Sequence, residues 1–309
     1  MLSQLISLLL AFLIGLVSQR MGMCLVNAVG QLLRRRPTLF VSLVSCGLFG
    51  LLLGPLYGLS GFSQPLFIPE VGYWSLVLGG LLFGIASVLN DECSVGTLTK
   101  LASGHLAKMF TVIGWVLGIV LWHHLNMLTE HKIQQMAEIS SHQYWLTIGI
   151  VLLVLVFLSQ MHGDRRVVVS SLLLGALTSA LYTFEPQWTP SVFFYDLSRM
   201  FWAMDEGALT VQRVAVFGML LLGMLVYTLK GRTFRYQRLQ WLPVVRHLLA
   251  GMLMGIGASM MLGGNDSQIL LVFPTMTWVG AVPLAAIVLG VLVGVGGRGV
   301  WRRRNLTLS

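Results

Sequence analysis

Apolar runs long enough to cross a membrane recur along the whole chain, and most polar positions fall between them. A helix of about 20 residues is needed to cross the hydrocarbon core of a bilayer. The first run has no basic segment before it and no small-residue cleavage site after it, so we expect it to remain as a helix. We predict nine membrane-spanning helices, at roughly 3–19, 38–59, 73–89, 107–125, 143–161, 166–183, 208–229, 244–262 and 279–297.

Four further segments are apolar or amphipathic but too short to cross, at roughly 22–34, 92–104, 191–203 and 265–277. Each lies between two predicted spans, so the order span, short helix, span occurs four times. The span at 143–161 stands alone, and an unpaired crossing makes the second group of spans begin on the opposite face of the membrane. The pattern therefore predicts inverted repeats, with halves at 1–126 and 166–309 joined by a linker with a central helix at 127–165.

Two of the breaks between spans are variants of one another. Residues 80–93 read GLLFGIASVLNDEC, and residues 251–266 read GMLMGIGASMMLGGND. Apolar helices that break at matching places in two halves of a membrane chain indicate a transport site. Non-helical backbone survives at membrane depth only where protein buries it or a wet cavity hydrates it. Four breaks, two from each face, predict an hourglass with a central constriction.

Composition agrees with a membrane class. Hydrophobic residues make up 56% of the chain, charged residues make up 10%, and the mean hydropathy is +0.82. Soluble globular domains have a charged content of about 25%. The fold class predicted is an all-α polytopic membrane protein of nine crossing helices and four short membrane-embedded helices.

The distribution of basic residues predicts the orientation, because short cytoplasmic loops collect Lys and Arg. In the nine-span arrangement, all but three of the 20 basic residues fall on one side; the three are Lys132, Arg199 and Arg213. We therefore expect the N-terminus outside and the C-terminus in the cytoplasm. The formal charge of +9 follows from this topology and from contact with anionic membrane lipid, and it requires no nucleic-acid partner.

The breaks themselves supply candidate binding residues. The N-terminus of a half-helix presents free N–H groups and the positive end of the helix dipole, which favours an anion. Small and hydroxyl residues around the breaks allow close backbone approach and add donors; they are Gly96, Thr97, Gly263, Gly264 and Ser267. The glycines of the Gly-x-x-x-Gly pairs are instead typical of close helix packing.

Two polar dipeptides, Asp91-Glu92 and Asn265-Asp266, lie at the ends of membrane helices. Such groups cost several kcal/mol inside a membrane unless they are paired or hydrated. One interpretation is that they cap helices at the water interface. The other is that they line the path, where carboxylates repel an anion unless a base or a proton offsets them.

The chain has three cysteines and no Cys-x-x-Cys or His spacing typical of a zinc site. Cys46 lies in the middle of a predicted span and is expected to be an inert buried thiol. Cys24 and Cys93 each open a short segment just after a span. A thiol at a helix N-terminus has more thiolate character, so this pair is a candidate contact for a sulfur-containing ligand.

The sequence carries no sign of a cofactor. No Gly-x-x-x-x-Gly-Lys loop for nucleotide phosphates is present. Transport by such a chain is expected to be passive, ion-coupled or driven by another subunit.

Four motifs together resemble the YeeE/YedE sulfur-transport family. They are SQRMGMCLVNA at 18–28, VLNDECSVGTL at 88–98 with KLASG at 100–104, and GGND at 263–266. The resemblance implies a bacterial inner-membrane importer of thiosulfate or a related inorganic sulfur species. It also implies nine crossing helices, four short ones, an hourglass shape, and cysteines that touch the passing sulfur, here Cys24 and Cys93.

The last repeat departs from the thiosulfate-transporting branch of that family, which carries a cysteine after the Gly-Gly pair. This chain has Asn265-Asp266 there, so a relay of three cysteines cannot operate unchanged and another sulfur or selenium species is a possible cargo.

Two other functions stay open. One is a membrane sulfurtransferase that passes persulfide sulfur from Cys93 to a cytoplasmic sulfur carrier or sulfurtransferase. The other is a structural subunit of a larger membrane complex.

Overall fold

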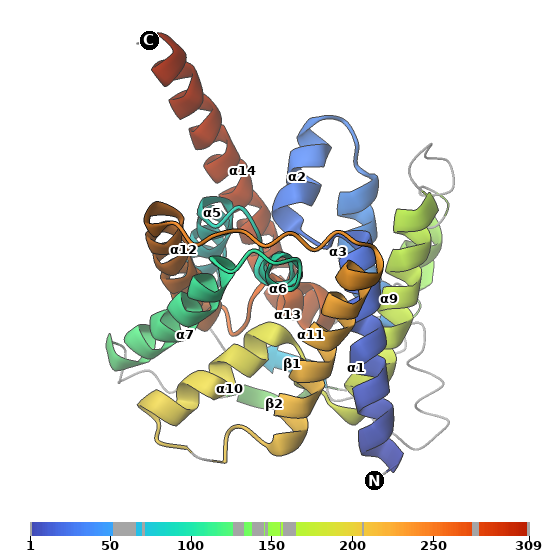
Figure 1. Ribbon diagram of the computed structural model, residues 1–309. Helices are drawn as coiled ribbons and strands as arrows, with labels where there is room; N and C mark the ends of the chain where they lie inside the picture. Colours follow the sequence, from blue (N-terminus) through green and yellow to red (C-terminus); the bar gives the residue numbers. More distant parts are fainter. Residues whose placement is uncertain are drawn as a thin grey trace.

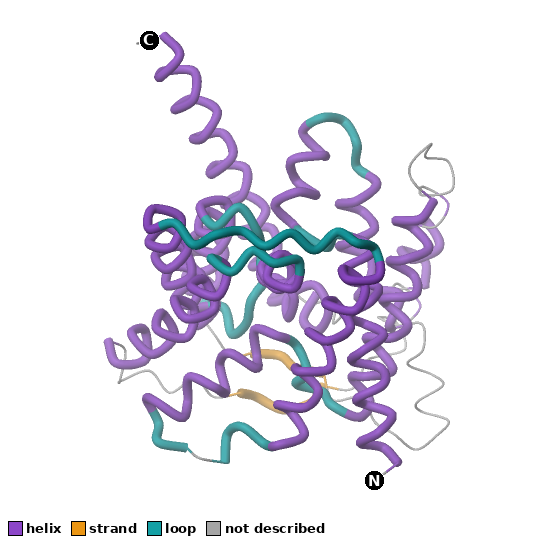
Figure 2. Tube along the Cα trace, in the orientation of Figure 1, coloured by secondary structure: helices purple, strands orange, loops and turns teal. Residues whose placement is uncertain are grey.

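The computed structural model describes residues 2–51, 66–69, 72–125, 133–137, 145, 148–154, 156, 165–205, 207–273 and 278–307. Helices dominate this part of the chain (Figures 1 and 2). The long helices are α1 (Leu2–Met21), α3 (Thr38–Leu51), α5 (Tyr73–Leu89), α7 (Lys108–Leu125), α9 (Arg165–Phe184), α11 (Val211–Lys230), α12 (Trp241–Met260) and α14 (Trp278–Thr307). The short ones are α2 (Leu25–Leu33), α6 (Ser94–Ala102), α10 (Pro190–Trp202) and α13 (Asn265–Ser267), the last followed by a π-helical turn, η1 (Gln268–Val272).

Seven helical stretches in the described residues are long and apolar enough to cross a membrane; they begin at α1, α5, α7, α9, α11, α12 and α14. The class of all-α polytopic membrane protein is thereby confirmed. The predicted crossing at 38–59 is described over the 14 residues of α3. Most of the predicted crossing at 143–161, like most of the linker at 127–165, lies outside the described residues.

The four predicted short segments are confirmed as helices separate from their neighbours. α2, α6 and α10 fall within or close to the expected ranges, and the fourth segment is divided between α13 and η1. One element was not expected: β1 (Leu66–Pro69) pairs antiparallel with β2 (Ile133–Ala137). Runs of four or five residues carry too little periodicity to be distinguished from loop in the sequence.

Glycines let the long helices approach closely, as the Gly-x-x-x-Gly pairs predict. A Cβ atom on Gly84 of α5 would collide with the carbonyl oxygen of Ile287 in α14. One on Gly255 of α12 would collide with the carbonyl oxygen of Trp115 in α7. The backbones of these two pairs therefore touch, which only glycine at the contact permits.

The packing of the long helices has an internal regularity. α7 packs on α12 and α5 packs on α14, while α1 packs on α11 and α9 packs on α3. Exchanging α1 with α9, α3 with α11, α5 with α12 and α7 with α14 maps each of these pairs onto another pair of the set. The two halves of the chain are thus built on one scheme of neighbours.

We call the side of the molecule on which α1 begins the N face and the side on which α14 ends the C face (Figure 1). α6 and α13 lie near the centre, with α10 toward the N face. Three aromatic rings lie beside the break before α13: the Trp115 ring centroid is 5.4 Å from that of Phe83 and 5.5 Å from that of Phe194, and a Cβ on Gly264 would stand 3.2 Å from the Trp115 ring. This chain of rings links α5, α7 and α10 next to the central breaks.

Candidate functional site

Three of the four breaks share one backbone turn. Gly22, Asp91 and Leu262 each follow the end of a long helix in the left-handed region, with φ of 64°, 67° and 55°. Such a residue ends a helix and redirects the chain. The next short helix begins three residues later in each case, with Cys24, Cys93 or Gly264 as its N-cap. These three N-caps therefore occupy corresponding positions.

Cys24 and Cys93 meet where the N-termini of α2 and α6 converge. We call these two cysteines, together with Gly96 and Thr97, the thiol junction. The backbone N–H of Leu25, at the start of α2, donates to Cys93 Sγ at 3.3 Å. The Cys24 side chain interacts with that of Cys93, and both thiols are free and buried. The two sulfur atoms thus lie at the positive ends of two half-helices.

Gly96 and Thr97 shape this junction. A Cβ atom on Gly96 would stand 3.2 Å from Cys24 Sγ and would also press on the Glu92 carboxylate. Thr97 Oγ1 donates to the Cys93 carbonyl oxygen at 2.7 Å. One residue provides the space for the thiols, and the other fixes the backbone that carries Cys93.

On the N-face side, hydroxyl and carboxyl groups take the place of thiols. We call Thr189, Ser191, Asp266 and Ser267 the carboxyl junction. Asp266 Oδ2 accepts from the backbone N–H of Ser191, in the first turn of α10, at 2.9 Å. Ser267 Oγ lies 2.8 Å from Thr189 Oγ1 and 2.6 Å from Ser191 Oγ. Here too a side chain from one break, Asp266, accepts a hydrogen bond at the N-terminus of a short helix from another break, α10.

Asn265 connects the two junctions. Its Oδ1 accepts from both the backbone N–H and the hydroxyl of Ser94, at 3.2 and 2.7 Å, and so occupies the N-terminus of α6. Cys93, Asn265 and Asp266 line one small cavity. Residues predicted from two separate motifs, far apart in sequence, are therefore brought together at the centre of the molecule.

The remaining predicted residues are placed as follows. Gly263 has φ of 138°, a backbone conformation that favours glycine, and a Cβ on Gly264 would press on Asp266 and Ser191. Glu92 is largely buried near the thiols, with Lys100 Nζ 3.8 Å from its Oε1. Asp91 is instead exposed toward the C face and paired with Arg246 and Arg298.

A polar cluster next to the thiol junction was not predicted from the sequence. Asn90, which is fully buried, uses its Oδ1 to accept from Lys108 Nζ at 3.2 Å, Thr111 Oγ1 at 2.7 Å and His247 Nδ1 at 2.9 Å. Because an amide oxygen only accepts, His247 Nδ1 carries the hydrogen. The Asn90 amide nitrogen donates to Thr97 Oγ1 and to the Glu92 carbonyl oxygen. Asn90 therefore ties α7 and α12 to the loop that bears Cys93.

A signal for this cluster was present in the sequence. Lys108 and His247 stand within apolar runs, and ionisable residues there are by default candidates for function. The hydroxyls of Thr189, Ser191 and Ser94 gave no comparable signal, because Ser and Thr are common in membrane helices.

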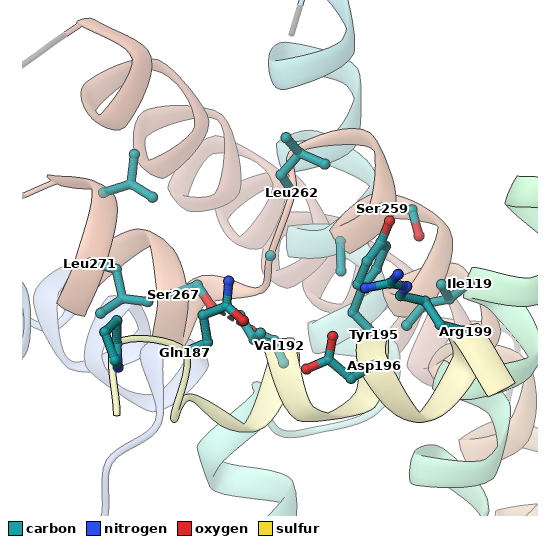
Figure 3. A pocket seen from close by; sticks show the side chains of 15 residues that line it. Ile119, Gln187, Val192, Tyr195, Asp196, Arg199, Ser259, Leu262, Ser267 and Leu271 are labelled. Carbon is teal, nitrogen blue, oxygen red and sulfur yellow. Dashed lines mark hydrogen bonds between the residues drawn. The ribbon is translucent and has the colours of Figure 1, made fainter. Parts of the chain in front are cut away.

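A pocket of about 120 Å³ opens beside the carboxyl junction. Figure 3 shows Tyr195, Asp196 and Arg199 lining it from α10, opposite Ser259 and Leu262. Arg199 pairs with Asp205, and Asp196 pairs with Arg213. Ser191 and Ser267 belong to both the pocket wall and the carboxyl junction, so the pocket reaches the central breaks.

Among the described residues, no three or more His, Cys, Asp and Glu side chains are grouped so that they could hold a metal ion. The polar groups at the centre are hydroxyls, thiols, amides, single carboxyls and helix N-termini. This set can bind a small anion through N–H and O–H donors and can contact a polarizable atom through sulfur.

Broken apolar helices whose short segments meet at buried polar groups and thiols define a membrane transporter of small solutes. The family model described as "Sulphur transport" matches residues 22–171 and 166–293, so the chain belongs to that family. It is also 23% identical, over 90% of its own length and 90% of the relative's, to the "Thiosulfate transporter TsuA" of Escherichia coli (strain K12). The family expected from the motifs is thereby confirmed, and the protein is a membrane transporter of sulfur compounds.

Proposed function

We propose that this transporter imports a small sulfur-containing anion, thiosulfate or a close analogue, through a constriction at the thiol junction. Support comes from the family and from the name of the Escherichia coli relative. The observation that most directly supports a path through the thiol junction is the hydrogen bond from Leu25 N to Cys93 Sγ, with Cys24 beside it. It puts a polarizable sulfur and a half-helix N-terminus at one point, which suits an anion that ends in sulfur.

Three half-helix N-termini supply donors along the proposed path. The N–H groups of Leu25, Ser94 and Ser191 are held by Cys93 Sγ, Asn265 Oδ1 and Asp266 Oδ2. Each of these acceptors is a side chain that can rotate away. A passing anion then takes over donors that are already oriented, so its loss of hydration is offset without a buried lysine.

The cargo is proposed at the level of a sulfur-terminated inorganic anion. The position after the Gly-Gly pair holds Asn265, where the thiosulfate branch carries a cysteine. Asn265 is seated on the N-terminus of α6, so that an amide dipole there replaces a thiol contact. We expect selectivity to depend on the two remaining thiols.

We further propose that residues 1–126 and 166–309 are inverted repeats about the central segment. The exchange of neighbours among the long helices supports this arrangement, as does the separate match of the family model to two stretches of the chain. The exposed connection between α11 and α12, drawn in teal across the middle of Figure 2, contains Arg232, Arg235 and Arg238. By the positive-inside rule we assign it to the cytoplasm of a bacterial inner membrane, with the N-terminus outside.

Uptake in cells tests the role of the thiol junction. In a strain that lacks other sulfur importers, Cys93→Ala is expected to lower uptake of labelled thiosulfate at least about tenfold, a loss of about 1.4 kcal/mol of transition-state stabilisation. The matched control is Cys46→Ala, because Cys46 is equally buried but its thiol donates to the Leu43 carbonyl within its own helix. Undiminished uptake by Cys93→Ala, with the protein at normal level in the membrane, would contradict the proposal.

A second experiment, on the purified protein, separates transport from sulfur transfer. A sulfurtransferase keeps a persulfide on Cys93 and delivers it to a cytoplasmic carrier, whereas a permease releases its cargo intact. Cys93 has only 1% of its surface exposed, which hinders a protein carrier from reaching it and favours passage of a small anion. Intact mass of the purified protein during turnover distinguishes them, since a stable gain of one sulfur atom indicates transfer.

A further inference from the structure

Asp266 is a buried carboxyl group that has no counter-charge in the part of the chain that the structure describes. Only 2% of its surface is exposed. Its Oδ2 accepts from Ser191 N, while its Oδ1 is buried with no hydrogen-bond partner among the described residues. None of the ion pairs between described residues includes Asp266. A carboxylate oxygen left without a partner in a buried site is costly, which makes protonation of that oxygen favourable.

The elements packed around α13 are η1, α10 and α6. From α6 and its N-cap, Ser94 and Cys93 face the site, and from η1 the polar neighbour is Gln268, whose amide donates to the Met261 carbonyl. The charged groups on α10 and beside α6 already have partners in three ion pairs: Asp196 with Arg213, Arg199 with Asp205, and Glu92 with Lys100. Cys93 is therefore the one other titratable group among the described residues that line the same small cavities.

The position of Asp266 sets up a competition with the transported anion. An ionised carboxylate on the N-terminus of α10 occupies the donor that an anion would use, and two negative charges there repel one another. Protonation removes the repulsion and weakens the hold on Ser191 N. It also puts a hydrogen on Oδ1, the oxygen without a hydrogen-bond partner among the described residues, and this hydrogen can be donated to an anion.

We propose that Asp266 is the proton-binding site that couples uptake of the sulfur anion to entry of one proton. This inference rests on the anion transport proposed above. The proton binds Oδ1 from the pocket on the N face when the anion arrives, and it leaves when the anion departs and Asp266 Oδ2 recovers the Ser191 N–H. Anion and proton binding favour each other, and by linkage each strengthens the other equally.

Proteoliposomes with the full-length protein test the coupling. Labelled thiosulfate is supplied outside, and a trapped pH dye reports the interior. The wild-type protein is expected to acidify the interior by about one proton per thiosulfate. Its apparent affinity for thiosulfate falls about tenfold for each pH unit above the titration of the site, because one proton is bound with each anion. Thiosulfate uptake without acidification would overturn the coupling but leave the proposed function standing, whereas no uptake at any pH would overturn both.

Two variants test the assignment to Asp266. Asp266→Asn has the same shape but binds no proton, so its thiosulfate binding, measured on the detergent-solubilised protein, is expected to lose its dependence on pH. Asp266→Glu is expected to keep coupling with a shifted pH midpoint. A pH dependence that persists unchanged in Asp266→Asn, or an unshifted midpoint in Asp266→Glu where Asp266→Asn does not fold, would overturn the assignment. Glu185→Gln serves as the matched carboxyl control, and it is expected to retain acidification.

Discussion

Cys93 and Gly264 are the N-caps of corresponding short helices, and both follow a long helix that ends in a left-handed residue. Their surroundings nevertheless differ in chemistry. Around Cys93 two soft thiols lie on half-helix N-termini, while around Gly264 a carboxyl group and three hydroxyls take those places. The same backbone turn thus carries a polarizable contact at Cys93 and a titratable, hydrogen-bonding contact next to Gly264.

The two turns are also held by different means. The helix C-cap before Cys93 is Asn90, which gathers Lys108, Thr111 and His247 around its amide oxygen. The corresponding C-cap before Gly264 is Met261, a fully buried apolar side chain. A fully satisfied polar network fixes a unique geometry. Its loss of one member is more destabilising than the loss of an apolar contact, because the other members then lose hydrogen-bond partners. The thiol junction is therefore expected to tolerate change in its support less well than the carboxyl junction.

Replacing Asn90, the polar C-cap before Cys93, by methionine, the residue at the corresponding C-cap Met261, is expected to have the largest effect on stability. Asn90→Met removes the amide oxygen that accepts from Lys108, Thr111 and His247, and it leaves Lys108 Nζ with the Asn90 backbone carbonyl as acceptor. Each buried donor left without an acceptor costs about 1–3 kcal/mol. Thermal unfolding in detergent measures the loss, and thiosulfate uptake is expected to fall with it. Met261→Leu is the matched control and costs less than about 1.5 kcal/mol, since it conserves volume. Equal losses in the two variants would show that the two turns do not differ in this way.

A methyl group at Gly96 is expected to have an intermediate effect. It would stand 3.2 Å from both Cys24 Sγ and Cys24 Cβ, and such overpacking costs about 1–3 kcal/mol. Gly96→Ala should therefore displace the Cys24 thiol and lower thiosulfate uptake several-fold. Gly30→Ala in α2 has open space around its Cβ and should stabilise the helix by about 0.5–1 kcal/mol. Normal uptake by Gly96→Ala would mean that the position of the Cys24 thiol is unimportant for passage.

Removing one hydroxyl from the carboxyl junction is expected to have the smallest effect. Ser267→Ala loses the contacts to Thr189 and Ser191, each worth about 1 kcal/mol, and the adjoining pocket admits water that offsets part of the loss. The apparent affinity for thiosulfate should weaken more than the maximal rate if the anion enters, as we propose, through the pocket that Ser267 lines. A loss of rate as large as that of Cys93→Ala would place the rate-limiting constriction at the carboxyl junction instead.

Much of the fold was predictable because it depends on local pattern. Apolar runs of crossing length located α1, α5, α7, α9, α11, α12 and α14, and shorter runs located α2, α6 and α10. The Gly-x-x-x-Gly pairs predicted close helix contacts, which Gly84 and Gly255 make. A π-helical turn after α13 was not predictable, since its hydrogen bonds depend on how η1 packs against α3 and α14.

The site was predictable in part. Cys24, Cys93, Asn265 and Asp266 were expected from motif and position, and the structure brings them together. Asp91 and Glu92 are adjacent in sequence, yet one turns toward the arginines of the C face and the other toward the thiols. The left-handed backbone conformation of Asp91 turns the chain, so that the two side chains point in different directions. The sequence pattern does not reveal the φ angle of one residue.

By itself the sequence determined that the chain is a helical membrane protein, where its helices break and which family it resembles, because hydrophobic length, glycine spacing and short motifs are local properties. Only the tertiary structure decided which groups meet at the breaks. Cys93 lies on the N-terminus of α2, Asn265 on that of α6 and Asp266 on that of α10. Each of these contacts joins residues at least 68 positions apart, and such pairings depend on helix packing that no local pattern encodes.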